Sequence, residues 1–371
     1  MRSTVQETIK TLFEKASTDD VAPGGNVAII KNGNVESFVS CGVLGRGPTE
    51  TRPVDKDTRY DIASLTKPIC TTTLAMLAVD KGVLDLNKSL GFYLRQAKGS
   101  PFEDVNISEL LGHSSGLPAH FRFFEAAWKK HGVSYTMPDH ELIALILASS
   151  KAYTSGSKSV YSDLGFILLG KILESIYSAG LDHVFKTFVT DPLELVSTSF
   201  HRISKSSIDP EHSEHIAPTE NCESRGRLKG VVHDENCHLM DGVAGHAGLF
   251  STLGDLTKVL LAWTGAFHGE SGFIKPETIK HFWQSSAAQN TSWKLGFDTP
   301  STTTGVSHAG DKFSRSSIGH LGFTGTSIWC DPSPQNAVII LTNRVYDSRE
   351  PVGIKSLRRA LMDSITEHHF Q

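Results

Sequence analysis

The segment "NVAIIKNGNVESFVSCG" (residues 26–42) decides the fold class expected for this chain of 371 residues. Two apolar-rich runs flank Asn32-Gly33, and a two-residue Asn-Gly connection favours a tight hairpin because both turn positions take positive φ. Near the other end, "TSIWCDPSPQNAVIILTNR" (326–344) has the same form, and an amphipathic helix is expected to follow over about 354–366. We therefore expect antiparallel strands near both ends of the chain.

The middle of the chain is predicted to be mostly helical. Segments 67–82, 138–150 and 162–180 carry apolar residues at helical spacing, and Gly82 and Gly180 stand where helices commonly stop. These patterns indicate an α/β protein of the α+β type. Its antiparallel sheet is built from N- and C-terminal strands and flanked by helices, with a mostly helical subdomain inserted. A cleft between the two parts is the natural place for a site.

The bulk composition is that of an ordinary globular protein. The formal net charge is −4 and no basic cluster exceeds a pair, so no nucleic-acid partner is expected. The longest apolar run, residues 142–148, is far shorter than the roughly 18 residues that would span a bilayer, and no membrane partner is expected. The first 20 residues lack the apolar core of a secretory signal, so we expect a cytoplasmic location unless a leader has been removed.

Ser64 and Lys67 lie three residues apart in "DIASLTKPIC" (61–70), where a strand-like segment gives way to a helix. One helical turn puts both side chains on the same face. A serine hydroxyl is a weak nucleophile until a base takes its proton, and a lysine kept neutral by desolvation can be that base. At a helix N-terminus, Ser64 would also lie near the positive end of the dipole, which favours negative charge beside its backbone amide.

An isolated S-x-x-K pattern has a second interpretation, in which Ser64 caps the helix and Lys67 is a solvated first-turn residue. The same pattern recurs at Ser155-Gly-Ser-Lys158, in a glycine- and serine-rich segment where no helix is expected. The motif therefore needs support from other segments.

Two segments supply that support, "VYSDLGFILLG" (160–170) and "IGHLGFTGTSIWCDP" (318–332). With "DIASLTKP" (61–68) they resemble the ordered motifs of the serine β-lactamase and penicillin-binding protein superfamily. The chain is most similar to the class C β-lactamase-like branch, which includes esterases and D-amino-acid peptidases. The resemblance implies a β-lactamase/transpeptidase-like fold.

The resemblance also implies one catalytic domain over residues 1–371. Its sheet lobe is expected to comprise about 1–62 plus 240–371, and its mostly helical lobe about 63–239.

By the same resemblance Ser64 is the acylated nucleophile and Lys67 its base partner. The Tyr-x-Asn motif of the superfamily matches Tyr161-Ser162-Asp163, which makes Tyr161 the residue that passes a proton to the leaving group. A phenol acidified by the neighbouring lysine would suit that role. The alternative for Tyr161 is an aromatic side chain packed beside a helix.

Two positions depart from the superfamily pattern. Asp163 replaces the usual asparagine; it either caps the following helix or lies near Lys67, where its charge would favour a charged lysine. The usual Lys-Thr-Gly becomes His320-Leu321-Gly322, which weakens recognition of a substrate carboxylate near neutral pH. Substrate-binding roles are expected for Asp163, His320, Leu321 and Gly322. The backbone amides of Ser64 and Phe323 are expected to form the oxyanion hole.

Several other side chains have open interpretations. A metal site would draw on His233, Asp234, Glu235, His238, Asp241 and His246. Their spacing is not that of an H-E-x-x-H helix, so polar loop and capping roles are favoured and no metal is expected. His113 is expected to be a hydrogen-bonded loop histidine or a supporting group of the site. Four aromatic residues either wall the cleft or pack in a helical core: Phe121, Phe123, Phe124 and Trp128.

Residues and resemblance together predict a cytoplasmic serine hydrolase that forms an acyl-enzyme and needs no cofactor. Its substrate is expected to be a small molecule or short peptide with an ester or amide bond, as for an esterase or a D-amino-acyl or peptidoglycan-type peptidase. Two alternatives stay open, a slow class C-like β-lactamase and a non-catalytic muropeptide- or peptide-binding protein of the same fold. Acylation of Ser64 separates the enzymes from the binding protein. The oligomeric state is not predicted.

Overall fold

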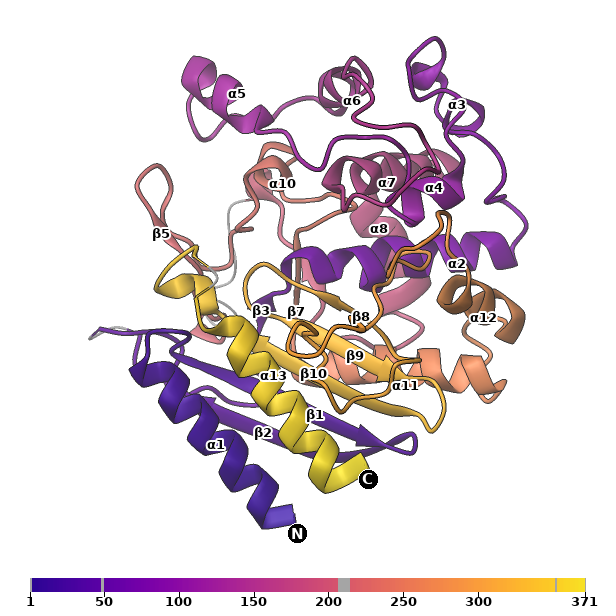
Figure 1. Ribbon diagram of the computed structural model, residues 1–371. Helices are drawn as coiled ribbons and strands as arrows, with labels where there is room; N and C mark the ends of the chain where they lie inside the picture. Colours follow the sequence, from indigo (N-terminus) through magenta and orange to yellow (C-terminus); the bar gives the residue numbers. More distant parts are fainter. Residues whose placement is uncertain (1, 48–49, 206–213, 351, 371) are drawn as a thin grey trace.

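A computed structural model describes residues 2–47, 50–205, 214–350 and 352–370. Its main sheet is antiparallel and has the strand order β2-β1-β10-β9-β8 (Figure 1). The strands are β1 (Gly24–Lys31), β2 (Asn34–Gly42), β8 (Ile318–Leu321), β9 (Ser327–Asp331) and β10 (Asn336–Thr342). Both predicted hairpins are confirmed, and strands from the two ends of the chain lie side by side, with Val27 opposite Ile340.

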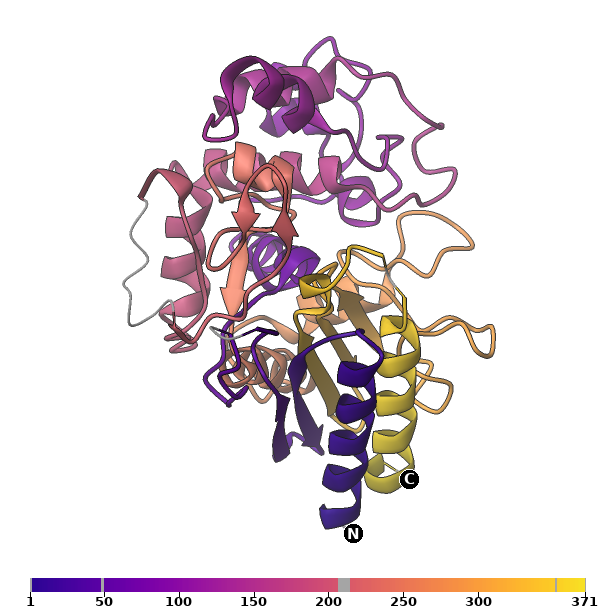
Figure 2. The same cartoon turned by 90° about the vertical axis from the view of Figure 1, so that its left-hand side faces the viewer.

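Both faces of the sheet are buried, which explains why β1 and β10 are almost continuously apolar. Alternate residues of β1 face opposite sides. Val27 and Ile29 pack in a cluster that includes residues of α1 (Arg2–Thr18) and α13 (Ile354–Ile365). Ala28 and Ile30 belong to a second cluster, to which α11 (Leu253–His268) contributes. Helices α1 and α13 run beside each other over one face, and α11 lies behind the other (Figures 1 and 2).

A mostly helical part lies above one end of the sheet in the view of Figure 1. Its helices are α2 (Thr73–Asp80), α3 (Leu90–Tyr93), α4 (Ile107–Leu111), α5 (Phe123–His131), α6 (Asp139–Leu147), α7 (Asp163–Tyr177), α8 (Leu181–Phe185) and α10 (Glu235–Leu239). Helix α12 (Pro276–Gln284) packs against α11 and α2. The predicted α+β class, with an antiparallel sheet and a helical insertion, is confirmed.

Short strands complete the structure between these parts. Strands β3 (Tyr60–Asp61), β7 (Leu249–Ser251) and β4 (Ser199–Phe200) form a three-stranded sheet. Strands β5 (Asn221–Cys222) and β6 (Gly226–Arg227) form a small hairpin.

One predicted helix stop is wrong. Gly82 follows α2 with φ of +68°, as expected for a glycine at a helix end. In α7, however, Ser178 takes the left-handed conformation at φ 52° and ψ 38°, while Gly180 precedes α8 at φ −60°. The helix therefore ends at Tyr177, three residues before the glycine that was expected to stop it.

No single helix in the described ranges has both the length and the apolar character needed to cross a membrane. Helix α7 and the segment Leu181–Thr190 meet those criteria only as a pair, and the pair is bent by 74°. Most of α7 is buried within the protein.

Candidate active site

Ser64 lies in a 3₁₀ turn, Ala63–Leu65, directly after strand β3. Ala63 has φ of +48°, a left-handed conformation that costs a non-glycine residue free energy and needs support from its surroundings. Buried Asp61 supplies that support: its carboxylate accepts the N–H of Ala63 at 2.8 Å and the N–H of His233 at 2.7 Å. The turn that presents Ser64 is thus held by a carboxylate that also fixes the segment of His233.

Lys67 is fully buried, and besides Tyr161 its amine contacts three groups. Nζ lies 2.7 Å from Oδ1 of Asp163, 3.1 Å from the carbonyl oxygen of His246 and 3.0 Å from Oγ of Ser64. The first two partners can only accept hydrogen bonds when Asp163 is ionised. A charged lysine therefore donates its third N–H to Ser64, whereas a neutral lysine offers Ser64 a lone pair.

Electrostatics favour the charged form of Lys67. Burial alone would lower the pKa of this amine, but its interactions with Asp163 and Tyr161 outweigh burial and raise the pKa above the ordinary value. Burial would likewise raise the pKa of Asp163, yet the Lys67 ammonium holds it well below its usual range. Of the two roles left open for Asp163, the structure shows the one near Lys67, where its charge favours a charged lysine. Asp163 points into the site, and the cap of α7 is Ser162.

Tyr161 lies beside the lysine, with Nζ of Lys67 4.7 Å from the centre of its ring. Its hydroxyl interacts with both Lys67 and Ser64. Burial raises the pKa of Tyr161 by more than Lys67 lowers it, so the expectation of an acidified phenol is wrong. Trp293 packs on Tyr161 with ring centres 5.3 Å apart, which fixes the plane of the phenol.

His320 is buried at the edge of the same cluster, 5.9 Å from the ring of Tyr161 between centres. Its Nδ1 lies 2.8 Å from the carbonyl oxygen of Leu321, while Nε2 has no hydrogen-bond partner among the described residues. Burial, and then the charge of Lys67, lower the pKa of His320 to about 3. A neutral imidazole therefore stands where the superfamily usually places an ammonium group.

Tyr161, Asp163, Trp293 and His320 line a cleft of about 720 Å³, a size typical of sites for small molecules and short peptides. Phe323 also lines it, and this residue is 48% exposed. The backbone N–H of Phe323 has no acceptor within the described part of the chain. Ser64, Leu321 and Gly322 line the same cleft. The predicted nucleophile, Tyr161 and the third motif therefore line one cavity, and Lys67 is buried beside it, 3.0 Å from Oγ of Ser64.

Comparison with known proteins identifies the family. A family model described as beta-lactamase matches residues 9–361. The chain belongs to the beta-lactamase family. A putative D-alanyl-D-alanine carboxypeptidase of Escherichia coli O157:H7 is 30% identical over 349 residues, which cover 87% of this chain and 79% of that protein. An N-acetylmuramyl-L-alanine amidase of Bacillus subtilis (strain 168) is 29% identical over 350 residues, covering 87% and 78%.

The fold agrees with this membership. A solved structure described as a class C beta lactamase has a TM-score of 0.73 to this structure at 19% identity, and the match covers 98% of each chain. The β-lactamase/transpeptidase-like fold is thereby confirmed. As a member of the beta-lactamase family, the protein is a serine hydrolase.

Several groups of this beta-lactamase-family site were not predicted from the sequence. His120 lies 3.2 Å from Asp163, between Nδ1 and Oδ2, and the hydrogen bond to Asp163 raises the pKa of the imidazole. Trp293 carries no motif that would mark it. Asp234 and His246 are in hydrogen-bond contact, 2.9 Å between Oδ1 and Nε2. They were noticed only as members of a metal hypothesis, because residue spacing does not show which partner each residue has.

The structure also shows the surroundings of the side chains whose interpretation was left open. Within the described ranges, no three His, Cys, Asp or Glu side chains are arranged to hold a metal ion. His113 is buried, and its Nδ1 accepts the N–H of Ser162 at 3.1 Å. Phe124 and Trp128 pack on each other with ring centres 5.1 Å apart, and neither lines the described cleft.

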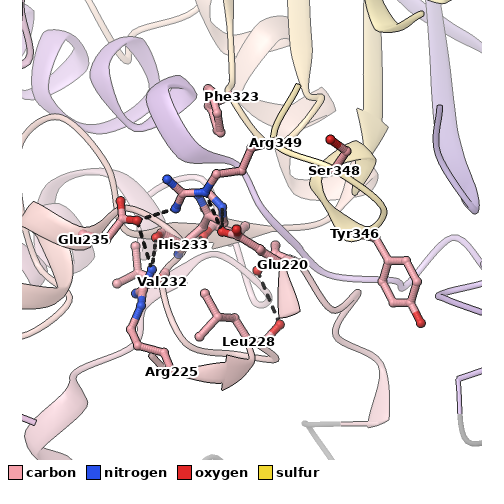
Figure 3. A network of polar contacts seen from close by, with 12 residues as sticks. Glu220, Arg225, Leu228, Val232, His233, Glu235, Phe323, Tyr346, Ser348 and Arg349 are labelled. Atoms are coloured by element: carbon pink, nitrogen blue, oxygen red, sulfur yellow. Dashed lines mark hydrogen bonds and ion pairs between the residues drawn. The ribbon is translucent and has the colours of Figure 1, made fainter. Parts of the chain in front are cut away.

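A polar network stands at one side of the cleft (Figure 3). Nε of Arg349 lies 2.7 Å from Oε2 of Glu220, and Nη2 of Arg349 contacts Glu235. Glu220 also contacts Nε2 of His233 at 3.0 Å, and the His233 ring stacks on Phe323. The network joins the loop after β10 to the segments around β5 and α10, and it supports the aromatic ring next to the proposed oxyanion amide.

Proposed function

We propose that this serine hydrolase cleaves an amide bond of a peptidoglycan-derived muropeptide. The observation that carries the proposal is the cleft, which has a volume of about 720 Å³ and is lined by charged groups of both signs. The anions include Asp163, Asp234 and Glu235, and the cations include Arg344 and Lys355. These features suit a large substrate with several polar groups. A short-chain ester would fill only a small part of this cleft. The names of the two relatives, a carboxypeptidase and an amidase, point to the same substrate class.

Acylation begins when Oγ of Ser64 attacks the carbonyl carbon of the amide and its proton passes to the Lys67–Tyr161 pair. The oxyanion is stabilised by the N–H groups of Ser64 and Phe323. The C–N bond then breaks, and the leaving nitrogen takes a proton from the hydroxyl of Tyr161. Water then attacks the carbonyl carbon of the resulting ester and gives a proton to the Lys67–Tyr161 pair. The pair returns a proton to Oγ of Ser64 as the carboxylic acid product leaves.

The resting state is not yet the reactive state. Lys67 is held as an ammonium by Asp163, so the Lys67–Tyr161 pair must carry one proton fewer before it can accept the proton of Ser64. Asp163 stabilises the protonated pair and thereby sets the pH at which the reactive form becomes populated.

The slow β-lactamase alternative is disfavoured by the same geometry. His320 is neutral and buried where a lysine usually helps to bind the carboxylate of a β-lactam. A cytoplasmic location is also part of the proposal; the five free cysteines are compatible with it. Cell fractionation with an antibody against the chain tests the location, and recovery outside the cytoplasm would contradict it.

The test offers two substrates to the wild-type protein and to Ser64→Ala. One is N-acetylmuramoyl-L-alanyl-D-isoglutamine, and the other is a stem pentapeptide that ends in D-alanyl-D-alanine. Mass spectrometry of the products should show free N-acetylmuramic acid from the first substrate with wild type and nothing with the variant. Release of D-alanine from the second substrate alone would assign a carboxypeptidase instead. Cleavage of neither, with hydrolysis of a nitrophenyl ester intact, would overturn the muropeptide proposal.

A further inference from the structure

The loop before α5 places an exposed histidine, His120, in the wall of the catalytic cleft. The backbone on both sides of this residue is fixed by hydrogen bonds. The carbonyl oxygen of Ala119 accepts the N–H of Asp163, the first residue of α7, at 3.0 Å. The carbonyl oxygen of Phe121 accepts Nδ2 of Asn236, a buried residue of α10, at 2.7 Å. The imidazole is therefore held at the cleft from two sides.

Asp163 also fixes the orientation of the imidazole ring. Nδ1 of His120 lies 3.2 Å from Oδ2 of Asp163. Although burial would raise the pKa of the Asp163 carboxyl group, the ammonium of Lys67 holds it well below its usual range, so the carboxylate is ionised and only accepts hydrogen bonds. Nδ1 of His120 is then the donor, and Nε2 of the neutral imidazole carries the free lone pair. Within the described ranges, Nε2 has no hydrogen-bond partner.

This arrangement is suited to general-base catalysis. In serine hydrolases, an imidazole that a carboxylate orients through one nitrogen takes a proton on the other. The hydrogen bond to Asp163 raises the pKa of His120, and the negative charges of Asp234 and Glu235 act in the same direction. A higher pKa makes Nε2 a stronger base.

The polar atoms of the Lys67–Tyr161 pair, by contrast, have their partners inside the protein. Lys67 is fully buried, and its amine contacts Asp163, a backbone carbonyl oxygen and Oγ of Ser64. The hydroxyl of Tyr161 interacts with Lys67 and Ser64. The pair is thus placed to exchange a proton with Ser64, whereas the free nitrogen of His120 is exposed to water in the cleft.

We propose that His120 is the general base of deacylation, which takes a proton from the water molecule that attacks the ester on Ser64. As the water oxygen bonds to the carbonyl carbon, one of its O–H bonds breaks and the proton moves to Nε2. The C–Oγ bond then breaks, Oγ takes a proton from the Lys67–Tyr161 pair, and the carboxylic acid leaves. The proton on His120 returns to the pair through Asp163, which contacts both His120 and Lys67. This inference rests on the proposed acyl-enzyme mechanism and adds a base to it.

The test separates formation of the acyl-enzyme from its hydrolysis. Excess protein is mixed with 4-nitrophenyl acetate and quenched at intervals; nitrophenol release measures acylation, and intact mass follows the acetyl group on Ser64. His120→Asn keeps an N–H for Asp163 but has no basic nitrogen. In this variant nitrophenol release should keep its wild-type rate, while loss of the acetyl group should slow by about 10²- to 10⁴-fold, the usual contribution of a general base.

Two further measurements separate catalysis from structural support. Imidazole added to acetylated His120→Ala should speed the loss of the acetyl group, because a soluble base can occupy the space of the missing side chain. Imidazole should not speed this step in wild type. His131→Asn, which changes an exposed histidine at the end of α5, should keep both wild-type rates.

A supporting role for His120 predicts different results. If His120→Asn slows nitrophenol release as much as loss of the acetyl group, or slows neither, the assignment as a base is overturned. An acetyl-enzyme of His120→Ala that does not respond to imidazole overturns it as well. Because an acetyl ester does not depend on the natural substrate, failure of the muropeptide function would leave all of these readouts in place.

Discussion

At the scale of single residues, the contact between Lys67 and Asp163 distinguishes this site from the usual Tyr-x-Asn arrangement. The 2.7 Å contact keeps the lysine charged inside the protein, next to the serine that it is proposed to activate. The second oxygen of Asp163 faces His120, which is 39% exposed and connects the buried pair to the open cleft. The buried Lys67–Asp163 pair therefore contacts a titratable side chain, His120, that is itself exposed to solvent.

Replacing Asp163 with asparagine removes the charge that raises the pKa of Lys67. Burial, the remaining large influence, then lowers that pKa, so the deprotonated pair forms at lower pH. The rising limb of log kcat/KM should move toward lower pH by at least about one unit, since a nearby opposite charge shifts a pKa by about 1–3 units. The rate of nitrophenyl-ester hydrolysis, followed from mildly acidic to mildly alkaline pH, measures this limb because kcat/KM reports the essential acid and base of the free enzyme.

The matched control is Asp191→Asn, which loses the same charge at an exposed ion pair with Lys186. Its pH profile should coincide with that of wild type. An unshifted limb in Asp163→Asn would contradict the proposed role of the Lys67–Asp163 pair.

The sequence predicted the site residues that belong to recognisable motifs. It did not predict those that reach the cleft only because of how the chain folds. Ser64, Lys67 and Tyr161 could be found because their types and spacing match a known pattern. His120, Arg344 and Lys355 reach the same cleft from distant parts of the chain. A single sequence does not show which segments meet in the folded protein, so no pattern marked these residues as part of the site.

At the scale of elements, hairpins were predictable because their turn chemistry is local. Asn32 and Gly33 take φ of 50° and 72°, as an Asn-Gly turn requires. The end of α7 was not predictable in the same way, because Ser178 takes a left-handed conformation that glycine usually supplies.

Ser178→Gly should therefore stabilise the protein. Serine in the left-handed region is strained and exposed here, and glycine removes the strain at no loss of packing. The expected gain in the free energy of unfolding is about 1 kcal/mol, measured by urea denaturation. In Gly82→Ala, at φ +68° after α2, the free energy of unfolding should fall by a similar amount. A stability decrease in Ser178→Gly would show that the serine side chain contributes more than its backbone costs.

At the scale of the whole molecule, the site depends on segments that are far apart in the chain. Strand β1 pairs with β10, and residues 61 and 233 are joined through the carboxylate of Asp61. The class of the fold followed from patterns at both ends of the sequence. The pairing of those ends, and the convergence of loops on Ser64, depend on tertiary packing that no local pattern reports.

Acid should destabilise the whole protein through its buried histidines. Burial lowers the pKa of His238 to about 4 and that of His320 to about 3, and it lowers that of His113 well below the ordinary value. In the unfolded chain these histidines bind protons near about pH 6.5, whereas in the folded protein they stay neutral to lower pH. Their contribution to stability is therefore full above that pH and is lost as the pH falls toward the folded-state pKa values.

Over that window, each of these histidines should lower the free energy of unfolding by about 1 kcal/mol for each unit that the pH falls. Urea denaturation at a series of pH values measures how the free energy of unfolding changes with pH, and this slope gives the number of protons taken up on unfolding. In His238→Gln that number should fall by about one. A free energy of unfolding that stays constant as the pH is lowered from roughly 6.5 to roughly 4.5 would contradict the neutral, buried state of these side chains.

The proposed mechanism is tested most directly by the intact mass of the protein during turnover of a muropeptide. Wild type is mixed with N-acetylmuramoyl-L-alanyl-D-isoglutamine, quenched in acid and compared with Ser64→Ala. A mass increase equal to an N-acetylmuramoyl group, located on Ser64 by peptide mapping and absent from the variant, is the predicted result. Release of N-acetylmuramic acid by Ser64→Ala at the wild-type rate, or an adduct on another residue, would contradict Ser64 as the nucleophile.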